Sequence, residues 1–132
     1  MNRRRSILAG LLAIPLLLAL SARWPGGITH ASFGFTVVGA CPIPAFDVRI
    51  DGGGTPWFRS KSHRVTLEEA QALLEDADVL VIATGWEGVV QVDAEVLKDA
   101  RVRTLRTGEA VELYNRLRSE GRRVAIILHS TC

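Results

Sequence analysis

The longest apolar stretch of the chain runs from Ile7 to Ala22 and closely follows three consecutive arginines at positions 3–5. A basic segment before an apolar one is typical of a signal peptide or an N-terminal membrane anchor. As a helix, this stretch would be about 24 Å long at ~1.5 Å per residue, which is shorter than a hydrocarbon core of about 30 Å. Pro15 also weakens a straight helix. The pattern therefore favours a cleavable signal peptide over a membrane-spanning anchor.

This leader predicts that the chain is brought to a membrane through residues 7–22, where it is either anchored or exported. The alternative is a start codon assigned too far upstream, with translation beginning near Ile28 and a cytoplasmic protein. A Pro-Gly-Gly turn at residues 25–27 is expected to end the leader. We therefore divide the chain into a signal peptide or anchor, residues 1–27, and one folded domain, residues 28–132.

Beyond the leader, two segments have helical periodicity. Thr66 and Glu69 form the capping pattern that opens a helix. Thr107 is expected to cap a second helix, which ends at Gly121, and a shorter helix is expected to begin at Asp93. The apolar residues that recur at helical spacing are Leu67, Ala70, Leu73, Leu74 and Ala77 in the first helix and Ala110, Val111, Tyr114 and Leu117 in the second.

Uninterrupted apolar runs at Val79–Ile82 and Val124–Leu128 predict strands that are buried on both faces. Between them, residues 101–105 predict a strand at the edge of a sheet, because the charged Arg101 and Arg103 discourage further pairing. Strand, helix, strand, helix and strand therefore follow one another from residue 79. This order predicts a largely parallel sheet with helices packed on it.

The segment between the leader and the first predicted helix has strand character. Residues 33–38 and 46–50 predict the two strands of an antiparallel hairpin, with Pro42 and Pro44 in the turn between them. A further short strand is expected to begin at residues 57–58. The sequence as a whole thus predicts a single α/β domain with a mixed, largely parallel central sheet and an N-terminal antiparallel hairpin.

Composition supports a folded domain and excludes three classes of protein: disordered chains, nucleic-acid-binding proteins and disulfide scaffolds. Hydrophobic residues are 48% of the 132 residues and charged residues 23%, which is too apolar for a disordered chain. The net charge of +2 comes from the leader: four of the 16 basic residues lie in residues 1–27, which leaves 12 against 14 acidic residues. No nucleic-acid partner is therefore expected. The two cysteines, Cys41 and Cys132, are too few for a disulfide scaffold, and their oxidation state stays open.

Residues with catalytic or metal-binding chemistry are sparse. His30, His63 and His129 have no second ligand at metal-binding spacing, so the sequence predicts no metal site. His129 and Cys132 are three residues apart in a chain that should be extended, where they would point to opposite faces. No local pair of nucleophile and base is therefore expected, and His129 is interpreted as a hydrogen-bonded residue that closes the end of the sheet. No dinucleotide or phosphate-binding motif follows a strand, and no cofactor is predicted.

The carboxyl ends of parallel strands meet at one edge of a sheet, where ligands commonly bind. Residues that follow the predicted strands are therefore the candidates for a ligand-binding crevice, although no reaction follows from their position alone. These candidates are Thr84, Gly85, Arg106, Thr107, His129 and Ser130. In the helix after Thr107, Tyr114 is expected in the core, and Asn115 is expected to hydrogen bond to a neighbouring backbone.

Several short segments, kept in order and spacing, resemble the small Mth-type domain family. They are Ala31-Ser32-Phe33-Gly34, Phe46-Asp47-Val48-Arg49-Ile50, Ser62-His63, Val81-Ile82-Ala83-Thr84-Gly85, Thr107 to Leu117, Gly121 to Ala125, and His129-Ser130-Thr131-Cys132. This family includes adipogenesis-associated Mth domain-containing proteins and a mitochondrial complex I assembly factor. The resemblance covers residues 28–132 and implies a three-layer α/β fold with a mixed central sheet. It implies no established reaction and carries over no catalytic residue.

Two classes of function remain open. The lack of a paired nucleophile and base favours a non-enzymatic interaction or assembly module, which acts at or across a membrane and binds a protein partner. The alternative is a small-molecule-binding protein or an enzyme that uses the crevice at the carboxyl ends of the strands. A pocket that encloses the side chains of His129, Thr84 and Arg106 would favour this alternative.

Overall fold

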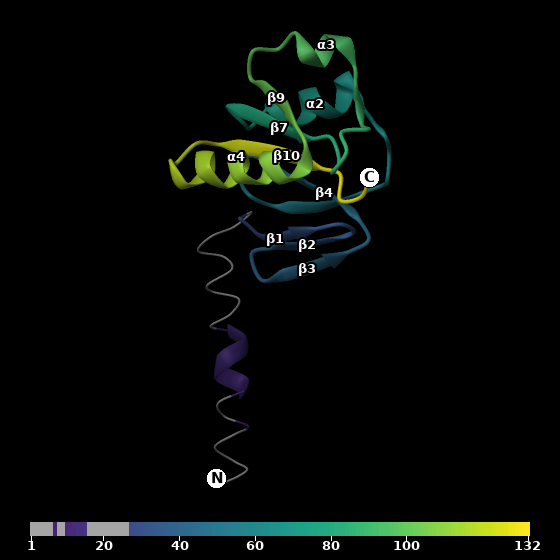
Figure 1. Ribbon diagram of the computed structural model, residues 1–132. Coiled ribbons are helices and arrows are strands. Elements are labelled where there is room, and N and C mark those ends of the chain that lie inside the picture. Colours follow the sequence, from purple (N-terminus) through teal and green to yellow (C-terminus); the bar gives the residue numbers. More distant parts are fainter. Residues whose placement is uncertain (1–6, 8–9, 16–26) are drawn as a thin grey trace.

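The computed structural model describes residue 7, residues 10–15 and residues 27–132 (Figure 1). Three sheets and the helices packed on them make up residues 27–132. In chain order the elements are β1 (Ile28–Ser32), β2 (Phe35–Val38), β3 (Cys41–Pro44), β4 (Asp47–Ile50), β5 (Pro56–Arg59), β6 (Arg64–Val65), α2 (Leu67–Leu74), β7 (Val79–Ala83), β8 (Gln91–Val92), α3 (Ala94–Leu97), β9 (Val102–Leu105), α4 (Thr107–Ser119) and β10 (Val124–Leu128).

The central sheet has five strands in the order β5-β4-β10-β7-β9. Strands β10, β7 and β9 are parallel, whereas β4 runs antiparallel to β10 and β5 antiparallel to β4. Every residue of β7 and β10 is buried, as their uninterrupted apolar sequences predict. Strand β9 is an edge strand, as expected from the arginines at positions 101 and 103, although the strand begins only at Val102. The prediction of an α/β domain with a mixed central sheet is therefore confirmed, but the sheet is not largely parallel, because only two of its four strand pairings are parallel.

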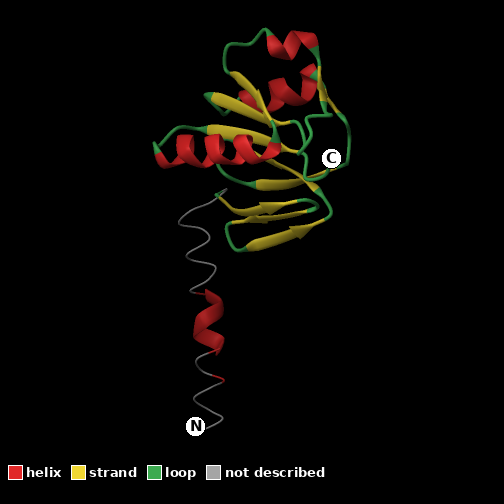
Figure 2. Ribbon diagram, viewed as in Figure 1, coloured by secondary structure: helices red, strands yellow, loops and turns green. Residues whose placement is uncertain are grey.

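Helices cover both faces of this sheet, which gives the three layers visible in Figure 2. Alternate residues of β7 divide the core: Val81 packs in a cluster with Tyr114 of α4, whereas Leu80 packs in a second cluster with Leu73 of α2. Because successive strand residues point to opposite faces, one strand supplies both cores. Tyr114 is fully buried, as expected.

The N-terminal strands differ from the predicted hairpin. Strands β1, β2 and β3 form a separate antiparallel sheet, and Pro42 and Pro44 lie in β3 rather than in a turn. Proline is tolerated there because β3 is an edge strand. The predicted strand 33–38 begins only at Phe35, since Gly34 adopts a left-handed conformation with φ +71° in the turn after β1. Strand β4 pairs with β10 and β5 instead of completing the hairpin.

The helix ends confirm two predictions and correct one. The backbone N–H of Glu69 donates to the Thr66 hydroxyl at 3.3 Å, so Thr66 caps α2 as predicted. Gly121, with φ +80°, follows the end of α4. Thr107, by contrast, is not a cap but the first residue of α4, and Arg106 is the N-cap. The hydroxyl of Thr107 is buried and donates to the carbonyl of His129 at 3.0 Å. The hydroxyl that would cap the helix is therefore engaged in a contact with the segment after β10 instead.

Asn115 joins α4 to the N-terminal sheet. Its side-chain amide accepts a hydrogen bond from the backbone N–H of Ile28 at 3.0 Å and donates one to the Ile28 carbonyl at 2.7 Å. The expectation that Asn115 bonds to a neighbouring backbone is confirmed. Strands β6 and β8, which pair in parallel, were not predicted because each has only two residues.

Most of the predicted leader lies outside the described residues. Of the stretch 7–22, the structure describes residue 7 and residues 10–15, which are helical. Within the part of the chain that the structure describes, no helix has the length and apolar character needed to cross a membrane. The domain boundary at residue 27 and the cellular localisation of the protein stay predictions.

Candidate functional site

Asp47 is a fully buried carboxylate at the end of the central sheet. It precedes Val48, which pairs with Leu128, so Asp47 is placed beside the residues that follow β10. Its Oδ2 lies 2.6 Å from Nδ1 of His129, and its Oδ1 accepts a hydrogen bond from the backbone N–H of Ser130 at 3.1 Å. A carboxylate only accepts hydrogen bonds, so His129 donates through Nδ1 and its Nε2 is left to face elsewhere.

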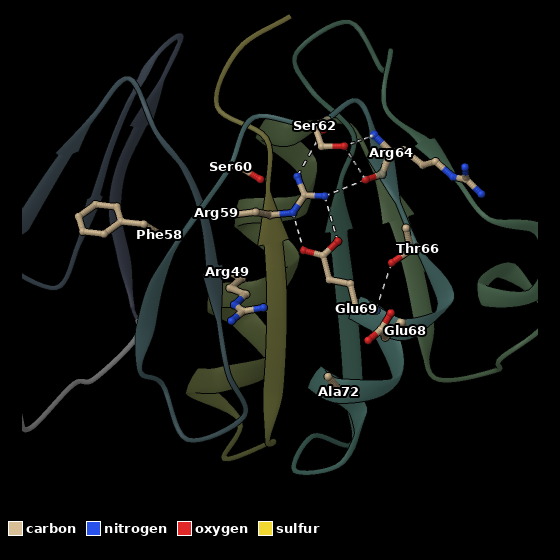
Figure 3. A pocket seen from close by; sticks show the side chains of 10 residues that line it. All are labelled: Arg49, Phe58, Arg59, Ser60, Ser62, Arg64, Thr66, Glu68, Glu69 and Ala72. Atoms are coloured by element: carbon tan, nitrogen blue, oxygen red, sulfur yellow. Dashed lines mark hydrogen bonds and ion pairs between the residues drawn. The ribbon is translucent and has the colours of Figure 1, made fainter.

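Arg59 joins this carboxylate to helix α2. It stands opposite Asp47 in the β4–β5 pairing, and its Nη1 lies 3.5 Å from Asp47 Oδ2. The other two nitrogens donate to both oxygens of Glu69, at 2.5 and 3.0 Å (Figure 3). Arg59 also donates to the carbonyl oxygens of Ser62 and Arg64. Because both Glu69 oxygens bind Arg59, the Glu69 side chain forms this ion pair instead of accepting a hydrogen bond from the Thr66 backbone N–H, which a complete capping box would require.

On its other side, His129 meets His63 and Cys132. The rings of His63 and His129 are 5.0 Å apart between centroids and inclined at 67°. The Cys132 Sγ lies 3.6 Å from His63 Nε2, and the ligand atoms of all three residues lie within 4.8 Å of one another. The prediction that Cys132 points away from His129 is wrong. The chain after Leu128 is not a strand, and Cys132 has φ +62°, so the alternation of an extended chain does not hold there.

Two open pockets flank this network. The first, of about 530 Å³, contains Arg49, Arg59 and Glu69, and Phe58 points away from the Arg59–Glu69 pair at its margin (Figure 3). The second, of about 620 Å³, is lined by His63, Arg64, Val89, Gln91 and Cys132. The buried ion pairs therefore lie beneath surfaces that are open to solvent.

The predicted crevice is only partly assembled. Thr84 and Arg106 do line one open pocket of about 350 Å³, together with Glu87 and Glu109. The Thr84 hydroxyl donates to the Leu105 carbonyl at 3.1 Å, so it is already engaged. Among the described residues that line this pocket, His129 is absent.

The other crevice candidates are engaged within the protein, and residues 131–132 lie directly over Gly85. A Cβ on Gly85 would lie 2.5 Å from the Cys132 carbonyl oxygen. The Ser130 hydroxyl donates to the Phe46 carbonyl at 3.1 Å, and Thr107 donates to the His129 carbonyl. His129 thus belongs to a different group of side chains from Thr84 and Arg106. A ligand-binding role for the six candidates stays a prediction.

Sequence reasoning missed the residues that organise His129. Asp47, Arg59, Glu69 and His63 were not candidates, because they lie 60 or more residues away from His129 along the chain, up to 82 for Asp47. One feature could have indicated Asp47, since an acidic residue at the start of an otherwise apolar strand needs a partner when it is buried. The contact with Asp47 at 2.6 Å confirms the interpretation of His129 as a hydrogen-bonded residue at the end of the sheet.

Residues 28–129 match the family described as "Protein of unknown function (DUF498/DUF598)". The chain belongs to this family. The expected Mth-type resemblance is confirmed. No protein with curated function is significantly similar to the chain.

Several solved structures are similar to this fold. The chain is 28% identical to MT938 with a TM-score of 0.70, over 80% of this chain and 97% of that one. It is 27% identical to the conserved hypothetical protein PH1505 from Pyrococcus horikoshii OT3, with a TM-score of 0.69 and coverage of 80% and 98%. The structure of an outer membrane protein from Bartonella henselae is 23% identical, with a TM-score of 0.67 and coverage of 82% and 97%. This last likeness shows the fold alone.

Proposed function

We propose that this DUF498/DUF598 domain is a protein-binding module rather than an enzyme. The observation that carries this proposal is an exposed pair of aromatic rings, Phe46 and Phe58. Their side chains are 53% and 71% exposed, and their ring centroids lie 5.2 Å apart. Exposed apolar groups that gather in one place are typical of protein interaction sites, whereas single exposed ones are common.

The backbone brings a third aromatic residue toward this pair. The Ala45 N–H donates to the Gly34 carbonyl at 2.7 Å, which joins the turns that carry Phe46 and Phe33. Phe33 is itself exposed. Ala45 has φ +60°, a conformation that non-glycine residues seldom adopt, so the chain bends sharply just before Phe46. We call the contacting pair Phe46 and Phe58 the aromatic patch, and Phe33 lies on the adjoining turn.

The aromatic patch lies beside an edge of the sheet. Phe58 is in β5, which pairs with β4 and ends the five-strand order. An edge strand offers backbone groups to a partner strand, and adjacent aromatic side chains offer apolar area. The expected partner is therefore a protein segment that contributes apolar side chains. Aromatic anchors of this kind carry ~2 kcal/mol or more each when they are hot spots.

The test compares two matched variants of the tagged, full-length chain purified from its native host. In Phe46→Ser/Phe58→Ser, the aromatic pair is removed at exposed positions. In the control Leu97→Ser, an exposed leucine of α3 is removed, where the side chain is 55% exposed. A specific partner is expected to copurify with the wild type and the control, and its affinity for the double variant is expected to fall about 1000-fold, which corresponds to ~2 kcal/mol for each ring.

Unchanged folding of both variants is checked by circular dichroism. A partner that binds the double variant as tightly as the wild type would place the binding surface elsewhere. Loss of binding in the Leu97→Ser control as well would show that the contact is not specific for the aromatic patch.

The proposed module acts at a membrane, to which residues 7–22 direct the chain. Three arginines before an uninterrupted apolar run support this address. Fractionation of the C-terminally tagged protein is expected to recover it with membranes or outside the cytosol. Recovery wholly in the soluble cytosol, with translation beginning near Ile28, would refute this part of the proposal.

A further inference from the structure

We propose that His63, His129 and Cys132 form a binding site for one divalent transition-metal ion, with Zn²⁺ as the best fit. The three residues come from two distant parts of the chain: His63 precedes β6, and the other two follow β10. Imidazole nitrogen and thiolate sulfur are the ligands that Zn²⁺ prefers in proteins. This site is independent of the aromatic patch and goes beyond the proposed protein-binding function.

The observed distances fit tetrahedral coordination. With Zn–N of about 2.0–2.1 Å and Zn–S of about 2.3 Å, nitrogen and sulfur ligands of one tetrahedral ion are roughly 3.5 Å apart. The Nε2 of His63 and the Sγ of Cys132 lie 3.6 Å apart. All three ligand atoms lie within 4.8 Å of one another, so closure around an ion needs a shift of about 1 Å. The exposed side chain of His63 can supply that shift.

His129 already has the orientation of a metal-binding histidine. Its Nδ1 donates to the buried Asp47 carboxylate at 2.6 Å, which fixes the ring and leaves the Nε2 lone pair directed away from Asp47. Histidine ligands of zinc commonly donate their second N–H to such a carboxylate. The Nε2 atom lies 3.5 Å from the Thr131 hydroxyl, next to Cys132 in sequence.

The local charge suits a divalent cation. A Cys132 thiolate, Asp47 and Glu69 supply three negative charges, and Arg59 supplies one positive charge. An excess of two negative charges therefore remains for the ion to neutralise. Binding releases the thiol proton of Cys132 to solvent, because the thiolate is the form that binds metal.

The other nearby cation, Arg64, is held by a partner of its own. Its Nε donates to Asp93 Oδ1 at 2.7 Å, so its positive charge is paired with that carboxylate. Arg64 lines the open pocket of about 620 Å³ that also contains His63 and Cys132. Three protein ligands beside an open pocket leave a fourth position for water or a small ligand, as in zinc sites that bind substrates.

The test uses the full-length chain, stripped with a chelator, and Co²⁺ as a spectroscopic substitute for Zn²⁺. Wild type is expected to bind one Co²⁺ per chain, with thiolate-to-cobalt charge-transfer absorption that Zn²⁺ abolishes by displacement. The matched control Cys41→Ser, which removes the exposed cysteine of β3, is expected to keep this absorption. Cys132→Ser is expected to lose it and to weaken Zn²⁺ binding more than about 100-fold.

Two further variants separate the direct ligand from the orienting residue. His63→Asn is expected to weaken Zn²⁺ binding as strongly as Cys132→Ser. Asp47→Asn is expected to weaken Zn²⁺ binding about 10- to 100-fold but to keep the charge-transfer absorption. This is the effect typical of a carboxylate that orients a histidine ligand without binding the metal itself. Absence of the absorption in wild type, or its persistence in Cys132→Ser, would overturn the proposed site. Its loss in Cys41→Ser would overturn the site as well, by showing that the bound sulfur is not that of Cys132.

Discussion

Asp47 and His129 are 82 positions apart in the chain, yet their side chains lie 2.6 Å apart, with neither exposed to more than 1%. The contact exists because β4 runs antiparallel to β10, so the first residue of β4 meets the residue that follows β10. It places a carboxylate behind the imidazole and joins three ion-paired or hydrogen-bonded elements, namely β4, β5 and the segment after β10.

Removing this carboxylate should destabilise the domain strongly. In Asp47→Ala, His129 and the Ser130 N–H lose a buried acceptor, and Arg59 keeps only its other partners. Breaking one side of a buried charge pair costs about 3–5 kcal/mol of unfolding free energy. Urea denaturation measures this loss. The control Glu95→Ala, which removes an exposed partner of Lys98, is expected to leave stability nearly unchanged. Equal, small losses in both variants would contradict a structural role for the buried pair.

The buried centre of the sheet gives a second prediction. Ile126 of β10 is fully buried between β4 and β7, so Ile126→Asp places an unpaired carboxylate in the core and is expected to unfold the domain. Ile126→Val keeps the site apolar and is expected to cost only about 0.5–1.5 kcal/mol. Thermal unfolding followed by circular dichroism distinguishes the two. A cooperative transition of Ile126→Asp at the wild-type temperature would place residue 126 outside the core.

The sequence alone predicts those features of the fold that depend on residues close together in the chain. The strands β7 and β10 were predictable because burial on both faces requires an uninterrupted apolar run, and Asn115 because an amide in a helix favours bonds to nearby backbone. The pairing of β4 with β10 was not predictable, because the two strands are about 80 residues apart in the chain and their register depends on the whole sheet.

The candidate site shows the same limit. Gly85 and Thr107 were correctly placed at the carboxyl ends of the strands, where Thr107 N–H donates to the Gly85 carbonyl at 3.0 Å. The rule about strand ends could not predict that residues 130–132 would turn back over this edge. It therefore grouped His129 with Thr84 and Arg106, whereas the structure groups it with His63 and Cys132.

Acid stability should depend on a surface carboxylate. A hydrogen bond from the Arg101 side chain, followed by one from the Arg101 backbone N–H, lowers the pKa of Asp99 to about 2. The folded-state pKa is below the unfolded value of about 3.9, so the stabilisation is present above about pH 4 and is lost as the pH falls through about 2. In Arg101→Gln, the pKa should rise only part of the way to about 3.9, since the backbone hydrogen bond remains.

Carboxyl chemical shifts measured by NMR during an acid titration give both pKa values directly. Because the pair is on the surface, added salt is expected to reduce the difference between wild type and Arg101→Gln. An Asp99 pKa near its ordinary value in the wild type would show that the ion pair does not form in solution.

A last prediction concerns the contact that holds Cys132 over the sheet edge. Gly85 has φ +101°, and a Cβ there would lie 2.5 Å from the Cys132 carbonyl oxygen and 3.1 Å from that of Thr131. In Gly85→Ala the segment must therefore move, against the hydrogen bond of 2.7 Å from the Glu87 N–H to the Cys132 carbonyl. Backbone strain of this kind costs about 1–3 kcal/mol before the clash is counted.

Gly121→Ala is the matched control, because Gly121 also has a positive φ, +80°, but a Cβ at this position would have no neighbouring atom within 4 Å. Both variants lose the conformational freedom of glycine, and only Gly85→Ala displaces Cys132. In a Cys41→Ser background, reaction of the remaining thiol with a colorimetric disulfide reagent reports on Cys132 alone. We expect it to react several times faster in Gly85→Ala than in Gly121→Ala, since His63 and the covering contacts no longer shield the sulfur. Equal rates would show that residues 130–132 leave this sheet edge readily in the unmodified chain.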